Sequence, residues 1–374
     1  MSRRDVAIVG AGMAGASLAA EIAGEASVLI LEAEAQPGYH STGRSAAFWS
    51  ESYGGPLVQP LTSASGRFLA DPPADFADAP LLEPRGAIHL ADAEGKAALE
   101  RLAVEFAGSE VPLEPMGRAA LAAAIPGLRP GWDAGLFEPS CADIDVARLH
   151  AAYLKRARAR GAELVCDARV ERAERAGGGW RIGTGAGVFE AAMLVDAAGA
   201  WADAVAVAAG EAPLGIRPYR RTIAQLRVDP PAPAALPLVI DARERFYFKP
   251  ESGGRLWLSP HDETPCDPGD CAAEELDVAL AIDRMSQAVD WRVRRVERRW
   301  AGMRSFAPDR LPVYGLSPSG RGFFWCAGQG GFGIQTAPAG AKLAAALLLG
   351  RAPDPLVAAI DSAPYRAERF TAAG

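Results

Sequence analysis

The chain has 374 residues, 49% of them hydrophobic, which is enough for two domains or for one large α/β body with an inserted subdomain. Gly and Pro supply 40 and 29 residues, less than a fifth of the chain, so disorder is not its main state. The formal net charge is −7 and the 39 basic residues comprise 35 Arg and 4 Lys. Without a basic excess, nucleic acid is not expected as a partner.

Cysteine usage and hydropathy exclude several further classes. The five cysteines, at 141, 166, 266, 271 and 326, form no CxxC pair, and the four histidines are scattered, so neither a disulfide framework nor a metal site is predicted. The N-terminal residues predict a strand, not a signal peptide, and the longest later apolar run, 343–349, is too short for a bilayer span. We therefore expect a soluble cytoplasmic protein with no membrane span. The oligomeric state is left open, with a monomer favoured.

Hydrophobic patterning predicts the elements in chain order. The first 35 residues predict a βαβ unit with strands over 6–9 and 27–31 and a helix over 13–23. Two more helices are predicted around 99–106 and 146–154. Short strands follow over 164–165, 168–173, 180–182, 187–189 and 193–195, then a second, antiparallel sheet over 216–228, 238–241, 246–249 and 256–259. The C-terminal part predicts a strand over 322–327, a loop over 328–333 and a helix over 336–349.

This order predicts an α/β fold with a Rossmann-like dinucleotide-binding domain interleaved with an antiparallel β-sheet substrate domain. No linker is long enough to separate independent domains. The expected segments are 1–80, 141–212 and 300–374 for the first domain, and 81–140 and 213–299 for the second.

Gly10, Gly12 and Gly15 form the motif GAGMAG directly after the first strand and at the start of the first helix. The first glycine permits the tight turn, the second lets the backbone approach a pyrophosphate, and the third lets the helix pack on the strand. Glu32, at the end of the next strand, suits a ribose hydroxyl. A glycine-rich turn without a ligand is the alternative, but strand, helix and acidic residue in register favour dinucleotide binding.

Two other segments favour FAD over a nicotinamide cofactor. Residues 328–333 form a glycine-rich loop before the C-terminal helix, and their backbone amides can face a polar ring or a phosphate. Residues 194–201 (LVDAAGAW) have the strand and small residues that let a backbone lie close to a flat ligand. A loop without a ligand is the alternative for 328–333. No second dinucleotide motif is present, so one extended cofactor contacted by both chain ends is the better interpretation.

These residues, with GYHSTGRSAA at 38–47, DAAGAW at 196–201 and WAGMRSF at 300–306, resemble the D-amino-acid oxidase superfamily of FAD enzymes. The resemblance runs from about residue 5 to about residue 350. Within the superfamily the chain is most similar to bacterial D-arginine dehydrogenase and related D-amino-acid dehydrogenases. The resemblance implies an FAD-binding domain, a β-sheet substrate domain, and oxidation of an amine at the carbon that bears a carboxylate.

The resemblance also assigns site residues. Those that would hold the substrate's carboxylate are Tyr53, Arg221, Tyr247 and Arg304. Those that would line the substrate pocket are Phe48, Ser50, Ala87, Gly331 and Gln335. Those that would contact FAD are Gly10, Gly12, Met13, Ala14, Gly15, Glu32, Ala33, Ser41, Thr42, Arg44, Ser45, Ala46, Ala47, Val170, Ala198, Gly199, Trp201, Gly302, Arg304, Gly330, Gly331, Phe332, Gly333, Ile334, Gln335 and Thr336.

Two departures from D-arginine dehydrogenase bear on the substrate. Ala87 replaces a carboxylate that pairs with a cationic side chain, and Phe48 replaces a pocket histidine. Losing that anion removes charge-assisted binding of a basic side chain. With Phe48, Trp49 and Ala87 around it, the pocket is expected to be apolar and to take neutral substrates.

The expected reaction is oxidative deamination of a neutral, apolar D-amino acid by hydride transfer from Cα to non-covalently bound FAD, giving an imine and then a 2-oxo acid and ammonia. Cys326, beside the glycine-rich loop, is not expected to attach the flavin. The alternatives are an FAD enzyme for an N-methyl or cyclic amino acid or a 2-hydroxy acid, a flavin-binding protein without turnover, and, more remotely, an NAD-dependent dehydrogenase. No acid or base is assigned, the roles of His40 and His89 are left open, and so is the electron acceptor.

Overall fold

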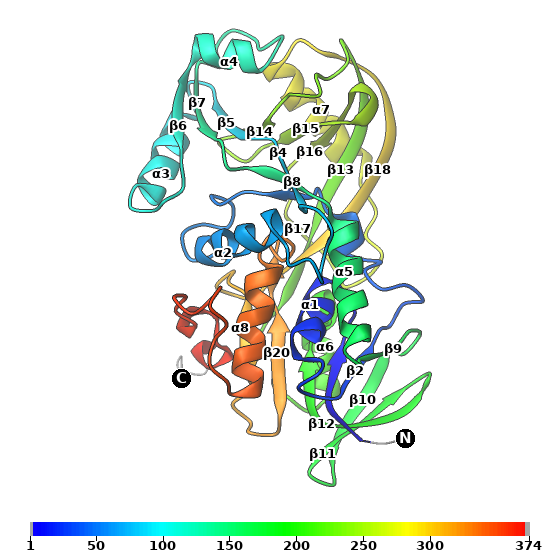
Figure 1. Ribbon diagram of the computed structural model, residues 1–374. Coiled ribbons are helices and arrows are strands. Elements are labelled where there is room, and N and C mark those ends of the chain that lie inside the picture. Colours follow the sequence, from blue (N-terminus) through cyan, green and yellow to red (C-terminus); the bar gives the residue numbers. More distant parts are fainter. Residues whose placement is uncertain (1–2, 371–374) are drawn as a thin grey trace.

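The structure is a computed structural model, and it describes residues 3–370. It is elongated, with two parts stacked along its long axis (Figure 1). The lower part in that view holds the N-terminal strand and a mostly parallel sheet, and the upper part holds a second, mostly antiparallel sheet. The chain passes between the two parts several times, so each is built from segments that are far apart in sequence.

The parallel sheet begins with the predicted βαβ unit. Five of its strands pair in parallel in the spatial order β9, β2, β1, β12, β20, and their bounds are β1 (Arg4–Val9), β2 (Val28–Leu31), β9 (Glu163–Val165), β12 (Gly187–Asp196) and β20 (Phe323–Ala327). An antiparallel strand, β19 (Val313–Leu316), continues beyond β20. The first half of β12 instead pairs with a hairpin formed by β10 (Val170–Ala176) and β11 (Gly179–Thr184).

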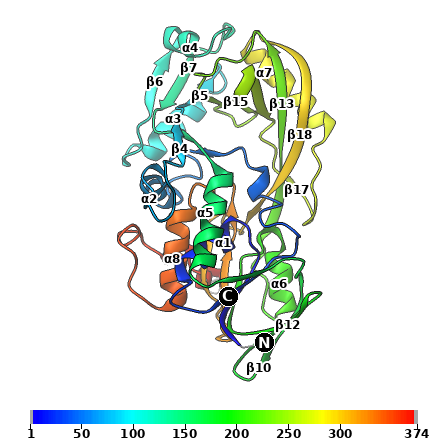
Figure 2. The ribbon, with the colours of Figure 1, turned by 45° about the vertical axis from the view of Figure 1, so that its right-hand side comes forward.

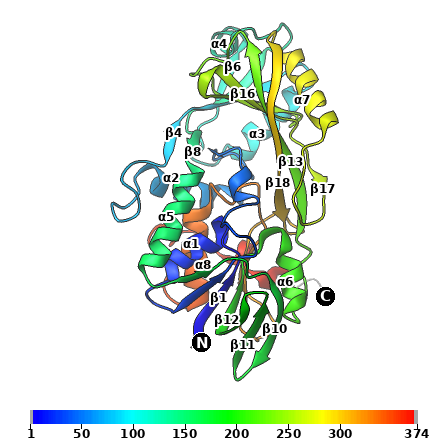
Figure 3. The ribbon, with the colours of Figure 1, turned by 90° about the vertical axis from the view of Figure 1, so that its right-hand side faces the viewer.

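Helices cover both faces of this sheet (Figures 2 and 3). One face carries α1 (Met13–Ile22), α5 (Val146–Ala159) and α8 (Ala337–Leu349), whose apolar residues share one core with Ile8, Ile30 and Phe324. The other face carries α6 (Ala202–Ala208) and the β10–β11 hairpin, which share a second core with Leu29, Leu194 and Trp325. The α8 helix ends at Gly350, which adopts the left-handed conformation (φ 63°) that favours glycine.

The second sheet has ten strands. Nine follow the order β21, β18, β13, β16, β15, β14, β5, β7, β6, with bounds β5 (Ala87–Ala91), β6 (Glu114–Gly117), β7 (Ala134–Glu138), β13 (Arg217–Asp229), β14 (Leu238–Asp241), β15 (Tyr247–Glu251), β16 (Arg255–Ser259), β18 (Arg292–Phe306) and β21 (Gln329–Gly330). The tenth, β17 (Thr264–Pro265), pairs with β13. All pairs are antiparallel except β14 with β5, so the expectation of an antiparallel sheet is right with one parallel exception.

The remaining elements surround these two sheets. A small sheet between the two parts has the order β3, β8, β4, and residues 3–370 also contain five short 3₁₀ helices. The bounds are β3 (Phe48–Trp49), β4 (Leu82–Pro84), β8 (Ala142–Ile144), α2 (Gln59–Ala70), α3 (Lys96–Phe106), α4 (Arg118–Ala124), α7 (Glu275–Ala288), η1 (Thr42–Arg44), η2 (Gly199–Trp201), η3 (Ser252–Gly254), η4 (Ala363–Tyr365) and η5 (Ala367–Phe370).

The longest pairing joins β13 to β18, which run side by side along the right-hand side of the upper part in Figure 1. Their register runs from Arg217 opposite Phe306 to Asp229 opposite Arg292. Because β18 leads into β19 and β20 of the other sheet, this ribbon carries residues of the upper part down to the glycine-rich segment of the lower part.

The structure corrects several sequence-based expectations. The sequence analysis did not predict the helices α2, α4, α6 and α7 or the strands β3, β4, β6, β7, β8, β17, β18, β19 and β21. The two strands expected over 187–189 and 193–195 are one continuous strand, β12. The other predicted elements form within a few residues of their expected bounds. Between residues 3 and 370, no helix combines the length and the apolar character that a bilayer crossing requires.

Candidate functional site

A cavity of about 950 Å³ lies where the two sheets meet. Its wall combines the N-terminal glycine turn, the loop 38–47, the turn after β12, the ends of β13 and β18, and the segment 329–335. Its volume is at the upper end of the range for small-molecule sites, which suits a dinucleotide together with a small substrate. Both chain ends therefore contribute to one cavity, as the sequence predicts.

The glycine turn between β1 and α1 is packed as a phosphate-binding turn requires. Gly10 has φ 100°, and a Cβ at Gly15 would overlap the Gly10 carbonyl, so neither position accepts a side chain. Glu32 is buried and lines the cavity; its carboxylate accepts hydrogen bonds from the amides of Ala11 (2.7 Å) and Glu34 (2.9 Å). Glu32 therefore fixes the turn as well as facing the site expected for the ribose.

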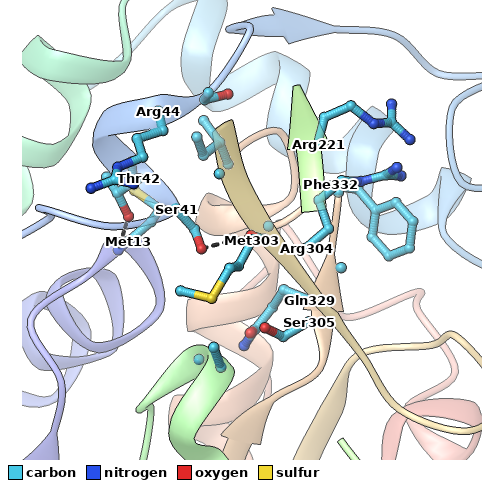
Figure 4. Close-up of a pocket in the computed structure, with 18 of the residues that line it drawn as sticks. Met13, Ser41, Thr42, Arg44, Arg221, Met303, Arg304, Ser305, Gln329 and Phe332 are labelled. Atoms are coloured by element: carbon cyan, nitrogen blue, oxygen red, sulfur yellow. Dashed lines mark hydrogen bonds between the residues drawn. The ribbon is translucent and has the colours of Figure 1, made fainter. Parts of the chain in front are cut away.

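The loop 38–47 is held between α1 and β18, as Figure 4 shows. The Thr42 hydroxyl accepts a hydrogen bond from the Met13 amide (3.0 Å), and the Ser41 hydroxyl donates to the Met303 carbonyl (2.7 Å). Arg44 lies against β18, where its guanidinium donates to the Ala301 carbonyl (3.2 Å) and a Cβ on Gly302 would meet its side chain. These contacts form a rigid wall on the expected phosphate side of the cavity.

The segment 329–335 forms the opposite wall and anchors the end of the cavity where the substrate is expected. The Gln335 side chain is buried and donates to the carbonyls of Ser50 and Tyr53 (3.1 Å each) and to the Thr62 hydroxyl (2.9 Å), while its oxygen accepts from the Ser50 amide (3.3 Å). Because these bonds occupy its amide group, Gln335 acts by holding the turn that carries Tyr53. A Cβ on Gly331 would overlap the Tyr53 hydroxyl and the Arg304 guanidinium.

Two buried arginines face the cavity from neighbouring strands. The β13–β18 register pairs Tyr219 with Arg304 and Arg221 with Gly302, so Arg221 and Arg304 project from the same face of the sheet (Figure 4). Their exposed fractions are only 7% and 9%. Arg220 faces the opposite side, as the strand pattern predicts, and pairs with the acidic residues Asp262, Glu274 and Asp277.

The guanidinium groups of these two arginines are incompletely paired. Arg221 Nε donates to the Asp262 carbonyl (2.8 Å), and Arg304 donates to Glu263 (2.7 Å) and to the Tyr53 hydroxyl (2.5 Å). Arg221 Nη2 and Arg304 Nε are buried without a hydrogen-bond partner in the described part of the chain. A buried donor left unpaired costs about 1–3 kcal/mol, so a carboxylate ligand that pairs with both would be bound strongly.

Two phenols complete this end of the cavity. Burial raises the pKa of Tyr53 to about 12 and also raises the pKa of Tyr247. Their hydroxyls therefore stay protonated at neutral pH and can donate hydrogen bonds to an anion. The Phe48 ring lies 5.5 Å from the Tyr53 ring and 5.9 Å from the Tyr247 ring, which gives the cavity an aromatic wall beside the arginines.

Sequence reasoning missed two ionisable residues beside this aromatic wall, His261 and Glu263. Glu263 accepts from Arg304 and from Arg310 (2.9 Å) and lies 3.5 Å from Arg221 Nη2. The His261 ring lies 5.4 Å from the Tyr247 ring, and burial, with the nearby Arg221, lowers its pKa well below the usual value. A single His and a single Glu in an irregular segment carry no periodicity or motif, so no sequence signal could have found them.

The two histidines that the sequence left open have partners of their own. His40 Nε2 lies 3.1 Å from a Glu34 oxygen in the cofactor half of the cavity. His89 lines the half of the cavity where the substrate is expected, 3.3 Å from the Ser52 hydroxyl and 3.6 Å from Glu138. Glu138 is fully buried, and although burial opposes its charge, His89 and the Ser50 and Ser52 hydroxyls lower its pKa below the usual value.

Most of the predicted site residues line the cavity, including all four that were predicted to hold the substrate's carboxylate. The exceptions among the described residues are Gly15, Ala87 and Thr336. Ala87 is fully buried behind Phe48 and Tyr247, and the Trp49 indole points away, donating to the Thr62 carbonyl (3.0 Å). The expectation that Trp49 and Ala87 surround the pocket is therefore wrong, and polar and ionisable side chains share the cavity wall with Phe48. Over residues 3–370, no group of three or more His, Cys, Asp or Glu side chains could hold a metal ion.

Comparison with known proteins agrees with this geometry. The family described as FAD dependent oxidoreductase (DAO) matches residues 5–347. The chain is similar to a glycine oxidase of Pseudomonas aeruginosa, with 28% identity over 68% of this chain and 66% of that protein, so the match spans just under two thirds of the relative's length.

Solved structures give the same result over nearly the whole chain. A glycine oxidase from Geobacillus kaustophilus has a TM-score of 0.84 with 26% identity over 98% of both chains. An L-amino acid deaminase from Proteus vulgaris has a TM-score of 0.82 with 16% identity over 99% of this chain and 98% of that chain, which shows a shared fold. These relatives do not single out D-arginine dehydrogenase. The chain belongs to the FAD dependent oxidoreductase (DAO) family, and FAD is its cofactor.

Proposed function

We propose that the protein oxidises a neutral D-amino acid to its imine with FAD as the two-electron acceptor, and that the imine hydrolyses in water to a 2-oxo acid and ammonia. The observation that carries this proposal is the pair of buried arginines, Arg221 and Arg304, each with one donor that lacks a hydrogen-bond partner within residues 3–370, at a cavity that fits a dinucleotide. A buried cationic pair of this kind suits a carboxylate, the group shared by all amino acids.

The proposed cofactor site joins the glycine turn at Gly10 and Gly12, the loop with Ser41 and Thr42, and the C-terminal glycines Gly330 and Gly331. The tight packing of the glycine turn and the size of the cavity both fit FAD bound without a covalent link. When bound, FAD supplies the hydride acceptor, and the protein supplies binding and orientation. The segments 1–80, 141–212 and 300–374 remain our proposal for the FAD-binding domain, with 81–140 and 213–299 for the substrate domain.

In the proposed reaction the substrate is oriented by four residues that we call the carboxylate clamp: Tyr53, Arg221, Tyr247 and Arg304. Arg221 and Arg304 grip the carboxylate, and the neutral phenols of Tyr53 and Tyr247 donate to it. Fixing the carboxylate at one end sets the direction of the Cα–H bond, and such positioning lowers the barrier without an acid or a base acting on Cα. The amine must be unprotonated before hydride leaves, and we assign no residue to remove its proton.

Two features support the neutral D-amino acid. The set Tyr53, Arg221, Tyr247 and Arg304 resembles that of D-amino-acid dehydrogenases, and the aromatic wall formed by Phe48 beside it offers apolar contact to a substrate side chain. Ala87 itself carries no charge, and the carboxylate opposite it on β7, Glu138, is already paired with the Ser50 and Ser52 hydroxyls and with His89. A cationic side chain would therefore lack a partner there.

A second candidate is glycine or an N-substituted or cyclic amino acid. It is favoured by the similarity to glycine oxidases from two organisms, at 28% and 26% identity. The same arginines would hold its carboxylate, and the cavity would accept either substrate.

A substrate panel with an artificial electron acceptor tests the proposal. The purified protein should be yellow and should turn over D-leucine or D-phenylalanine faster than their L-enantiomers, D-arginine, glycine, sarcosine and 2-hydroxy acids. Turnover of glycine or sarcosine alone would select the second candidate. Flavin that binds but is not bleached by any amino acid in the absence of oxygen would leave a flavin-binding protein without this activity.

A further inference from the structure

The segment between β16 and α7 runs from Arg221 and Arg304 to the loop 38–47; we call residues 261–271 of this segment the strap. The first residues of the strap contact the two arginines: the Asp262 carbonyl accepts a hydrogen bond from Arg221, and Glu263 pairs with Arg304. Asp262 also accepts from the amide (2.7 Å) and hydroxyl (3.0 Å) of Thr222. This end of the strap is therefore fixed to the strand β13.

The other end of the strap sits on the loop 38–47. Asp270 forms an ion pair with Arg44, and its second oxygen accepts from the Tyr39 hydroxyl (3.2 Å). The Cys271 carbonyl accepts from Arg44 Nη1 (3.4 Å). Arg44 also lies over the Tyr39 ring, 5.1 Å from its centroid. The position of the Arg44 guanidinium, on the expected phosphate side of the cavity, thus depends on where the strap ends.

Within the strap, two thiols face each other. The sulfur atoms of Cys266 and Cys271 are 3.5 Å apart, and both side chains are partly accessible. Cys266 is anchored by its amide, which donates to the Pro218 carbonyl (3.1 Å) on β13. A disulfide needs the sulfurs at about 2.0 Å, so bond formation requires a shift of about 1.5 Å in the short turn between the two residues. Cys141 and Cys326 are buried, and Cys166 has no such neighbour among the described cysteines.

We propose that Cys266 and Cys271 form a reversible intramolecular disulfide, with a hydroperoxide as the oxidant, and that this bond holds the strap on Arg44 and slows the release of FAD. The bond would close a ring whose one end is anchored on β13 and whose other end carries the Asp270 and Cys271 contacts to Arg44. The ring would restrict the conformations of that turn, so the turn would less often move Asp270 away from Arg44.

The chemistry assigns a different part to each thiol. Burial, with the adjacent Cys271 thiol, raises the pKa of Cys266 to about 12, so Cys266 keeps its proton at neutral pH. Cys271, as its thiolate, attacks the hydroperoxide, the O–O bond breaks, and a sulfenic acid and an alcohol or water form. The Cys266 sulfur then displaces the sulfenic hydroxyl; its proton leaves with that hydroxyl as water, and the sulfur–sulfur bond forms. Two thiols are oxidised and one peroxide is reduced.

The holoenzyme tests this directly with hydrogen peroxide as the probe. After brief oxidation and alkylation, trypsin should release the peptide 256–284, which contains both cysteines, with an internal disulfide and resistant to alkylation until reduced. On dilution into FAD-free buffer, the oxidised protein should release FAD at least about threefold more slowly than the reduced protein does. Flavin fluorescence measures the rate of release. Cys266→Ser and Cys271→Ser should each abolish this difference, and Cys166→Ser should retain it.

The order of the two steps has its own readout. A sulfenic-acid probe should label Cys271 in the Cys266→Ser protein and should not label Cys266 in the Cys271→Ser protein; the reverse pattern would overturn the assigned order. Absence of the internal disulfide in oxidised holoenzyme would overturn the proposed site. A disulfide that forms but leaves the rate of FAD release unchanged, or raises it, would overturn the proposed effect on Arg44. None of these outcomes depends on which amino acid the enzyme oxidises.

Discussion

Replacing Arg304 tests the carboxylate clamp most sharply. Arg304 Nε is the unpaired donor, while its other nitrogens bond Tyr53 and Glu263. In Arg304→Met the substrate loses one charge-assisted hydrogen bond, about 1.5–3 kcal/mol, which corresponds to roughly a 10- to 150-fold higher Kd. Arg304→Lys keeps the charge but loses the planar fork, so we expect a loss nearer the lower end.

The assay uses stopped-flow absorbance to monitor flavin reduction in the absence of oxygen. Two substrates are compared: the best amino acid from the substrate panel and the corresponding amine without a carboxylate. The limiting rate and the apparent Kd are measured separately, at matched FAD content. Wild type should bind the amino acid far more tightly than Arg304→Met does, and the two proteins should treat the amine alike. Equal losses for the amino acid and the amine, or an unchanged Kd for the amino acid, would refute the clamp.

Three further substitutions probe the site and its support. Gly331→Ala would push against Tyr53 and Arg304, so substrate affinity, compared at matched FAD content, should fall by about 1–3 kcal/mol; a normal KM would contradict this. Glu138→Gln should cost about 1.5–3 kcal/mol in the free energy of unfolding at pH 7, because Glu138 is a buried acceptor. Because the fold lowers the pKa of Glu138, wild type should be more stable than Glu138→Gln above pH 4.5, and this difference in the free energy of unfolding should shrink as the pH falls below 4.5. Urea unfolding at several pH values measures the difference. The pH dependence that Asp196 contributes has the opposite sign, because burial raises its pKa. The free energy of unfolding should fall as the pH rises above 3.8, by about 1.4 kcal/mol per pH unit until the folded-state pKa is reached. Asp196→Asn should therefore be at least as stable as wild type at pH 7 in thermal unfolding; a lower melting temperature would contradict this.

The elements that sequence reasoning found are those whose buried faces leave a periodic pattern. The strand β2 is buried along its length, β1 at its last four residues and α1 at all but one residue, and the expected βαβ unit forms. The strand β18 was not predicted because its first half is an arginine-rich, largely exposed segment without a buried face; only its last six residues are buried. Pairing with β13, a long-range interaction, makes it a strand.

The site was predictable where a motif carries the chemistry. The glycine turn and Glu32 follow from spacing, and Arg221 and Arg304 were separated from 33 other arginines only by resemblance. Which way a side chain points from a short strand was not predictable: in β3, Phe48 faces the cavity and Trp49 packs toward α2, where a Cβ on Gly66 would meet its ring. His261 and Glu263 reach the clamp only through the path of the strap.

The most direct test of the proposed activity is anaerobic mixing of the purified yellow protein with the D- and L-enantiomers of one neutral amino acid. We expect the D-enantiomer to bleach the flavin and to yield one 2-oxo acid per flavin, with the L-enantiomer slower by at least tenfold. Bleaching by the L-enantiomer at an equal rate, or by neither, would contradict the proposed substrate.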